Sequence, residues 1–283
     1  MKLIKKARST LFPKISSVRA LFFLPILYCS LLPVGESLSA EPQWKEIKSE
    51  HFIVHFEKDE GFAKEVSRKS EMYYRKIASE LGYQRYSGFW TWDNRVTIDI
   101  HPTLESFLAA TNQPQWSQGV ANYTTKSIAS YALSKEFLDG LLPHELTHLI
   151  FRDYVGFKGD VPLWLDEGVA QWMEPKKRKA VQFVIKRLAR EGKLFSLEQM
   201  MTLDIRTSND NARVGVYYVQ AVSLVSFLVN KYGTVRFTNF CRQLRDGKNV
   251  ADALVFAYPR SLRSLEDLEI KWQKYIEEGN NGT

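Results

Sequence analysis

The chain has 283 residues, of which 45% are hydrophobic and 13% aromatic, with 39 basic against 32 acidic side chains. These ordinary proportions exclude a disordered, collagen-like or low-complexity chain, and only two cysteines exclude a disulfide-rich fold. No uninterrupted apolar run reaches the roughly 18 residues of a membrane span, which excludes a polytopic membrane protein.

The first 40 residues have the order of a secretory signal peptide. Basic residues up to Arg19 precede an apolar stretch, Ala20 to Val34, and small or polar residues then end at Ala40. We therefore predict a leader over residues 1–40, cleavage after Ala40, and export to the periplasm or the extracellular space. The alternative is an uncleaved leader that anchors the chain in a membrane.

Removing this leader takes away six basic residues and one acidic residue, so the basic excess falls from seven to two. The mature chain is thus nearly neutral and carries no basic recognition motif, so we expect no nucleic-acid partner. Cys241 then becomes the only cysteine, and its apolar neighbours at helical spacing predict that it is buried.

The mature chain alternates strand and helix patterns in its first half and is helical in its second. Strand patterns lie at 46–48, 52–56 and 96–100, and the pattern at 119–133 fits one or two strands. Helical patterns lie at 62–81, 104–110 and 141–150. Further helical patterns follow at 162–174, 177–192, 215–231, 234–246 and 262–277. We predict an α+β fold of two lobes, with an α/β lobe over 41–159 and a helical lobe over 160–283.

Residues 144–148 read His-Glu-Leu-Thr-His, an HExxH motif. On a helix, residues four apart share one face about 6 Å apart along the axis, so His144 and His148 can bind one zinc ion. Glu145 lies beside them, where its carboxylate can take a proton from the water that the metal activates. The alternative is an ordinary helix with two surface histidines.

A catalytic zinc ion needs three protein ligands and an open position. Glu167, in the segment Trp164-Leu165-Asp166-Glu167-Gly168, lies 19 residues after His148, which leaves room for a loop and a second, antiparallel helix. The alternative is a solvated acidic pair, but the apolar neighbours of Asp166 and Glu167 indicate a buried segment, where carboxylates need partners.

An HExxH motif followed after 18 residues by Glu within WLDEG resembles the arrangement of gluzincin metallopeptidases. The chain is similar to the aminopeptidase N group and, more closely, to small bacterial peptidase-MA-like proteins. This resemblance implies a thermolysin-like fold with a small mixed sheet, and one zinc ion per chain bound by His144, His148 and Glu167. It also implies that Glu145 is the general base, and Asp166 is a candidate to support one of the histidine ligands.

A third motif opens at Tyr218, which resembles the Tyr-x-x-Gly start of a family helix, with Ala221 in place of glycine. The resemblance implies that the Tyr218 hydroxyl stabilises the oxyanion of the reaction. The alternative is that Tyr218 and its neighbour Tyr217 only pack in the core.

The aminopeptidases of this group carry a Gly-Ala-Met-Glu-Asn strand whose glutamate binds the free amine of the substrate. The corresponding segment here begins Gly119-Val120-Ala121-Asn122 and contains no acid. We therefore predict an endopeptidase in which Gly119 and Ala121 lie on an edge strand that pairs with an extended peptide. Pro143 requires the zinc helix to begin close to it, because proline is tolerated only in the first turn.

The sequence as a whole predicts an exported zinc endopeptidase that acts on a peptide or protein. The alternative is a non-catalytic pseudopeptidase, a peptide- or envelope-binding module. A basic segment from Lys176 is either a solvated face or a peripheral contact with an anionic membrane or envelope surface. His51 and His55 lie about 13 Å apart on an extended strand, too far to share one metal, and are expected to be exposed or hydrogen-bonded.

Overall fold

The structure is a computed structural model that describes residues 43–82, 90–115, 117–132, 136–156, 161–205, 208 and 210–279. Residues 42–283 form one compact unit. The expected leader and its cleavage site lie outside the described residues.

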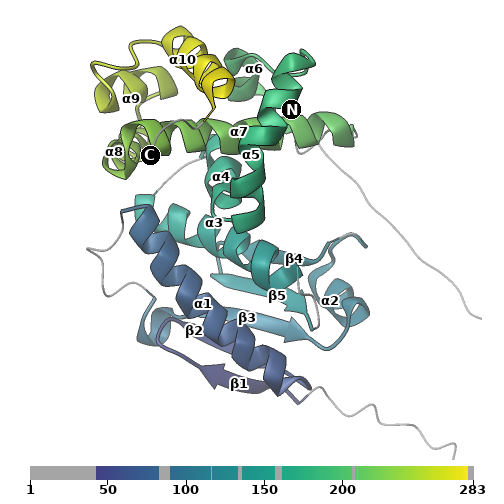
Figure 1. The fold of residues 1–283 in the computed structure, drawn as a ribbon. Coiled ribbons are helices and arrows are strands. Elements are labelled where there is room, and N and C mark those ends of the chain that lie inside the picture. The colour runs from purple at the N-terminus through teal and green to yellow at the C-terminus, as the bar shows by residue number, and fades with distance from the viewer. Residues whose placement is uncertain are drawn as a thin grey trace, which may run out of the picture. The chain divides into compact units, whose positions relative to one another are not determined.

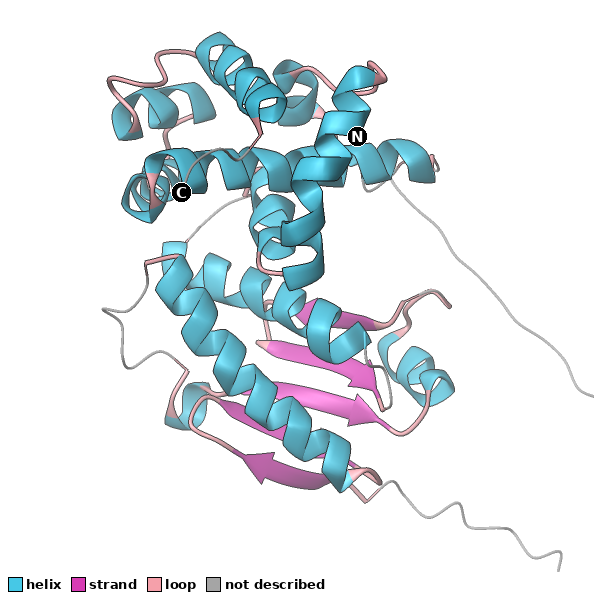
Figure 2. Ribbon diagram, viewed as in Figure 1, coloured by secondary structure: helices cyan, strands magenta, loops and turns pink. Residues whose placement is uncertain are grey.

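Five strands form one mixed sheet in the order β1-β2-β3-β5-β4 (Figure 2). They are β1 (Lys45–Lys48), β2 (Phe52–Phe56), β3 (Val96–His101), β4 (Gly119–Asn122) and β5 (Ser127–Tyr131). The two outer pairs are antiparallel, and β2, β3 and β5 run parallel. The central strands bury alternate side chains, as the period of two along a strand requires. The strand β4 is left at the edge of the sheet, beside β5 alone.

The helices α1 (Glu60–Glu80) and α3 (Leu142–Val155) contact each other, and they also contact β2 and β4, respectively. Asp59 caps α1 by accepting a hydrogen bond from the backbone N–H of Phe62. The shorter helix α2 (Leu104–Thr111) contacts β5 and β3, and a single 3₁₀ turn, η1, spans Trp92–Asn94. A π-helical turn, η2 (Phe137–Leu141), leads directly into α3.

Every described element from Leu163 onward is a helix, which together with the sheet confirms the α+β fold (Figure 1). These helices are α4 (Leu163–Trp172), α5 (Pro175–Arg190), α6 (Leu197–Thr202), α7 (Asn211–Tyr232), α8 (Thr234–Arg245), α9 (Val250–Ala257) and α10 (Leu265–Glu278). The long helix α7 is central, because it contacts α4, α5, α8 and α10. Cys241 on α8 is buried and free, as expected.

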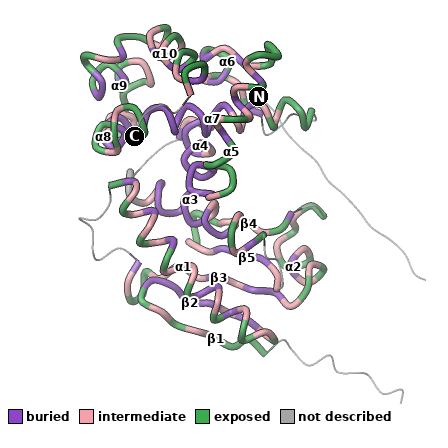
Figure 3. Tube along the Cα trace, in the orientation of Figure 1, coloured by how far each residue is buried: buried purple, intermediate pink, exposed green. Residues whose placement is uncertain are grey.

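Among the described residues, α7 is the one helix long and apolar enough to cross a membrane. The sequence predicts a helix at 215–231, but polar residues interrupt its apolar runs, so it did not stand out as a possible membrane span. Most of its apolar window is buried against neighbouring helices (Figure 3). Burial inside the protein is what a central core helix requires, so its composition has a structural explanation.

The segment expected as one or two strands at 119–133 contains two, β4 and β5, which are joined by a tight turn. Asn122 starts this turn, and its side-chain oxygen accepts hydrogen bonds from the backbone N–H groups of Thr124 and Thr125. Pro143 lies in the first turn of α3, where its missing N–H does no harm, and the wide π-helical turn immediately precedes it.

Candidate active site

Two imidazoles project from one face of α3 toward the same point. His144 and His148 are one helical turn apart, and their Nε2 atoms lie 3.1 Å from each other. The ring of His148 is buried, whereas that of His144 is partly exposed to solvent. The spacing of four residues thus produces the convergence of ring nitrogens that the motif predicts.

Glu167 brings the third donor atom from α4. Its Oε2 lies 3.6 Å from Nε2 of His144 and 4.0 Å from Nε2 of His148. Around a tetrahedral zinc ion with bonds of about 2.0–2.1 Å, neighbouring ligand atoms are about 3.3–3.4 Å apart. The three side chains form a possible metal-binding group whose separations are close to these values, so the residues fit zinc.

A carboxylate fixes the other nitrogen of each imidazole. Nδ1 of His148 lies 3.0 Å from Oδ1 of Asp166, and Nδ1 of His144 lies 2.8 Å from Oε1 of Glu174. A carboxylate only accepts hydrogen bonds, so each Nδ1 carries a proton, which leaves each Nε2 as the atom that a metal ion would bind. Carboxylate partners of this kind orient and strengthen histidine ligands of metals.

The position of Glu167 depends on a close contact between α4 and α7 at Gly168. A methyl group on Gly168 would lie 2.6 Å from the carbonyl oxygen of Ala221 on α7. Only glycine therefore permits this approach of the two helices. The contact gives Ala221 a structural explanation as well, because its small side chain is buried at the same crossing.

The charges around His148 favour a cation. Burial opposes the charged imidazolium, but the carboxylates of Asp166, Glu167 and Glu145 outweigh it and raise the pKa of His148 to about 9. Burial also opposes ionisation of Asp166, yet His148 and Arg152 lower the pKa of its carboxyl. Several carboxylates thus converge on two imidazoles, and a divalent cation bound there would neutralise their negative charge.

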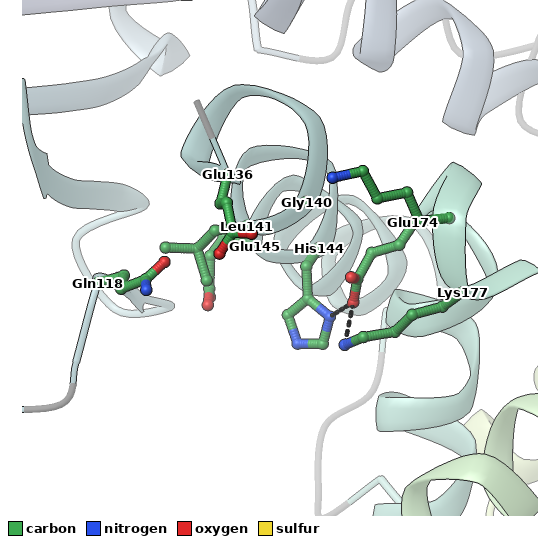
Figure 4. Close-up of a pocket in the computed structure, with 9 residues that line it drawn as sticks. Gln118, Glu136, Gly140, Leu141, His144, Glu145, Glu174 and Lys177 are labelled. Carbon is green, nitrogen blue, oxygen red and sulfur yellow. Dashed lines mark hydrogen bonds and ion pairs between the residues drawn. The ribbon is translucent and has the colours of Figure 1, made fainter. Parts of the chain in front are cut away.

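Glu145 lines a cavity of about 420 Å³ that reaches His144. Figure 4 shows Gln118 and Glu145 on one side of His144, and Glu174 and Lys177 on the other. The rest of the lining comes from η2, from the residue before it and from the start of α5: Glu136, Gly140, Leu141 and Lys176. A substrate in this cavity would lie next to both Glu145 and His144, one of the proposed metal ligands.

The expected substrate strand, β4, is an edge strand and contacts α3. Gln118, which immediately precedes it, lines the cavity. A side chain at Gly119 would overlap Leu141, with 2.4 Å between a methyl carbon and Cδ2, so this glycine is needed for packing. The strand β4 ends at Asn122, where the turn to β5 begins.

Tyr218 lines a second, mostly apolar cavity between α5 and α7, not the cavity that Glu145 lines. Lys177 borders both cavities, so the two are neighbours. Tyr217 points elsewhere, since it is buried and its hydroxyl donates to the carbonyl oxygen of Met200. The structure thus separates the two tyrosines, as their positions on one helix predict.

Sequence reasoning did not find Tyr123, which follows β4 directly. Its ring lies 6.2 Å from the ring of His148 in an edge-on arrangement, and the guanidinium of Arg152 lies 4.3 Å above it. Burial, together with the nearby charges of Asp166, Glu145 and Glu167, raises the pKa of Tyr123. Its hydroxyl is therefore held in the protonated, hydrogen-donating form beside the site.

Arg152 and Glu174 were also missed. Arg152, four residues after His148, donates to Oδ2 of Asp166 at 2.6 Å. It therefore fixes the position of the carboxylate that contacts Nδ1 of His148. Glu174 lies seven residues after Glu167, a spacing of two helical turns that could have indicated a shared face.

His51 and His55 have carboxylate partners of their own, in keeping with the expectation that they are exposed or hydrogen-bonded. His51 contacts Glu71, and His55 contacts Asp99, each at 2.8 Å. His51, Glu71 and Glu50 also form a second group of closely spaced potential ligands. However, both Glu71 oxygens already accept hydrogen bonds from His51, one from its ring and one from its backbone.

Two comparisons with known proteins bear on this site. A family model described as the peptidase MA superfamily matches residues 91–278, about two thirds of the chain. The matched range includes α3, α4, Tyr123 and Tyr218. No curated protein matches the chain.

Proposed function

Because the chain belongs to the peptidase MA superfamily, we propose that it is an exported zinc endopeptidase that acts on peptide or protein substrates. Family membership supports a peptidase in general. The observation that carries the finer proposal is the convergence of His144, His148 and Glu167, with both Nδ1 atoms held by carboxylates.

His144, His148 and Glu167 would hold the zinc ion. When bound, zinc supplies a Lewis acid that polarises the scissile carbonyl group and makes a water molecule more acidic. The residues around the ligands prepare this site. Asp166 and Glu174 fix the imidazoles, and Arg152 fixes Asp166.

Glu145 serves as the general base. It follows His144 in the chain and lines the same cavity, so a water molecule that attacks the substrate there lies within its reach. The Glu145 carboxylate accepts a proton from that water and later delivers it to the leaving amine. The two transfers leave Glu145 as it began.

A hydroxyl donor near the ligands can stabilise the negative charge that develops on the carbonyl oxygen. Tyr218 is the candidate from the sequence, and Tyr123 is the candidate from the geometry. Tyr123 contacts the ring of His148, whereas Tyr218 lines the neighbouring apolar cavity. Their phenylalanine variants distinguish the two.

The absence of an acid at Asn122 supports endopeptidase action, because β4 carries no carboxylate that would bind a free amine. Glu136 is the specific observation that favours aminopeptidase action instead, since its carboxylate lines the cavity. Peptides with free and blocked amino termini separate these functions. An endopeptidase cleaves both, whereas an aminopeptidase requires the free amine.

The test of catalysis compares the wild type with Glu145→Gln after both have been loaded with zinc. We expect the variant to retain zinc and to lose peptide cleavage, because glutamine cannot accept the proton. If the wild type binds zinc but cleaves no member of a diverse peptide library, the pseudopeptidase alternative replaces this proposal.

A further inference from the structure

The outer face of α5 concentrates basic side chains around one apolar side chain. Successive residues of a helix are about 100° apart, which places Lys176, Lys179, Arg187 and Arg190 within about 40° of the direction of Phe183. All five are exposed. The Phe183 side chain is 75% exposed, which is unusual for so large an apolar group.

No acidic residue interrupts this face. Pro175 to Arg190 contains seven basic residues and no aspartate or glutamate. Glu191 lies beyond the end of the helix. Its carboxylate pairs closely with Lys193, at 2.7 Å from Nζ, and more distantly with Arg187, at 3.9 Å from Nε. The inner face of α5 is already buried against the protein through Val181, Ile185 and Leu188. Core packing therefore does not explain the exposure of Phe183.

We propose that this face, Lys176, Lys179, Phe183, Arg187 and Arg190, docks the protein on an anionic lipid surface. The four cations contact lipid phosphates, and Phe183 enters the headgroup region. Charge complementarity favours this partner, and the exposed ring favours lipid over a soluble acidic polymer. Basic residues combined with an aromatic group are the composition of helices that bind at a membrane surface.

The proposed face adjoins the candidate active site. Lys176, at the beginning of the face, also lines the cavity of Glu145 and His144. Docking through α5 would thus hold the mouth of that cavity close to the lipid surface, where membrane-associated peptides could enter the cavity. Lipid binding itself does not rest on the proposed peptidase activity, so the two can fail independently.

Sedimentation with lipid vesicles tests this proposal. Residues 42–283 form a compact unit with its own core, so they are used without the apolar leader, which would bind lipid by itself. The vesicles contain about one third phosphatidylglycerol in phosphatidylcholine, at about 0.1 M salt, and pure phosphatidylcholine vesicles are the comparison.

We expect binding to the anionic vesicles only. Lys179→Glu with Arg190→Glu should weaken it by at least about 25-fold, since each lost cation near the surface costs about fivefold. Phe183→Ser should weaken it at unchanged net charge. Lys248→Glu with Arg263→Glu is the matched control for the charge variant, and Val235→Ser, at another exposed apolar residue, is the control for Phe183→Ser. Both controls should bind like the wild type, apart from a small effect of the changed net charge in the first.

The proposal is overturned if the wild type does not bind anionic vesicles, or if the α5 variants bind no more weakly than their controls. Binding to soluble polyglutamate without binding to vesicles also overturns it, and would assign the face to an acidic polymer.

Discussion

Glu174 lies 2.8 Å from Nδ1 of His144, although it belongs to the junction between α4 and α5 and not to the zinc motif. Asp166 holds His148 in the same way from the first turn of α4. Along the chain, the third proposed ligand, Glu167 on α4, thus lies between Asp166 and Glu174, the two carboxylates that orient the histidine ligands. The three acids serve a single site, because α4 packs against α3.

We predict that Glu174→Gln weakens zinc binding by about 10- to 100-fold, the usual cost of losing a partner of a metal-bound histidine. The neutral amide accepts a weaker hydrogen bond and removes a negative charge from the site. Competition with a chelator of known affinity measures the effect. Glu136→Gln is the control, since Glu136 lines the same cavity, and an equal loss in both variants would refute a specific role for Glu174.

The second prediction concerns the tyrosines. Tyr123→Phe keeps the ring contacts with His148 and Arg152 and removes only the hydroxyl. If that hydroxyl stabilises the oxyanion, kcat falls by about 10²- to 10³-fold while zinc content and KM change little. Tyr218→Phe is the matched variant in the neighbouring cavity. A large loss of kcat in Tyr218→Phe alone would return the role to the residue that the sequence indicated.

The α4–α7 contact gives a prediction about stability. Gly168→Ala places a methyl group 2.6 Å from the Ala221 carbonyl oxygen, so the helices must separate at a cost of about 1–3 kcal/mol in the free energy of unfolding. Gly215→Ala on α7 is the control, because nothing lies within 4 Å of its added methyl group. Alanine should stabilise that helix by up to about 1 kcal/mol. Urea denaturation of both variants checks the contrast, which fails if Gly168→Ala is as stable as the wild type.

A fourth prediction concerns Glu71, which joins α1 to the start of β2. Burial disfavours its charge, but hydrogen bonds from the ring and the backbone N–H of His51 outweigh burial and lower the pKa of the Glu71 carboxyl. A lowered carboxyl pKa stabilises the folded state above the unfolded pKa, and this stability is lost as pH falls through the folded pKa.

Glu71→Gln should therefore lower the free energy of unfolding by about 1.5–3 kcal/mol at neutral pH. The difference from the wild type should shrink as the pH drops below about 4.5, because the carboxyl of the unfolded chain takes up a proton there and the folded carboxyl does so only at lower pH. Denaturant titrations across this range measure it. A difference that stays constant down to pH 3 would contradict the account.

The sequence predicted most of the fold and the proposed metal group, because both depend on local periodicity. The HExxH spacing places His144 and His148 on one face of any helix, and the apolar context of Glu167 indicates a second buried helix. The short helices α6 and α9 were not predicted, since their patterns extend over less than three turns. The sequence left open whether 119–133 forms one strand or two, and the turn formed by Asn122 separates the two strands.

The supporting residues could not be predicted in the same way. Tyr123 reaches His148 only because the β4–β5 turn folds toward α3, and Arg152 matters only because Asp166 faces it across two helices. Asp166 was identified as a partner, but which histidine it contacts depends on how α4 packs. Contacts between separate elements are set by tertiary packing, which a single sequence does not display.

The most direct test of the zinc site is the metal content of purified residues 42–283 after zinc loading and dialysis, with the wild type beside Glu167→Ala. We predict one zinc ion per wild-type chain. The variant should bind zinc much more weakly and lose most of it on dialysis, because only the two histidines remain as ligands. A wild-type chain that retains no zinc, or a variant that retains it equally well, would contradict the three-ligand site on which the proposed activity depends.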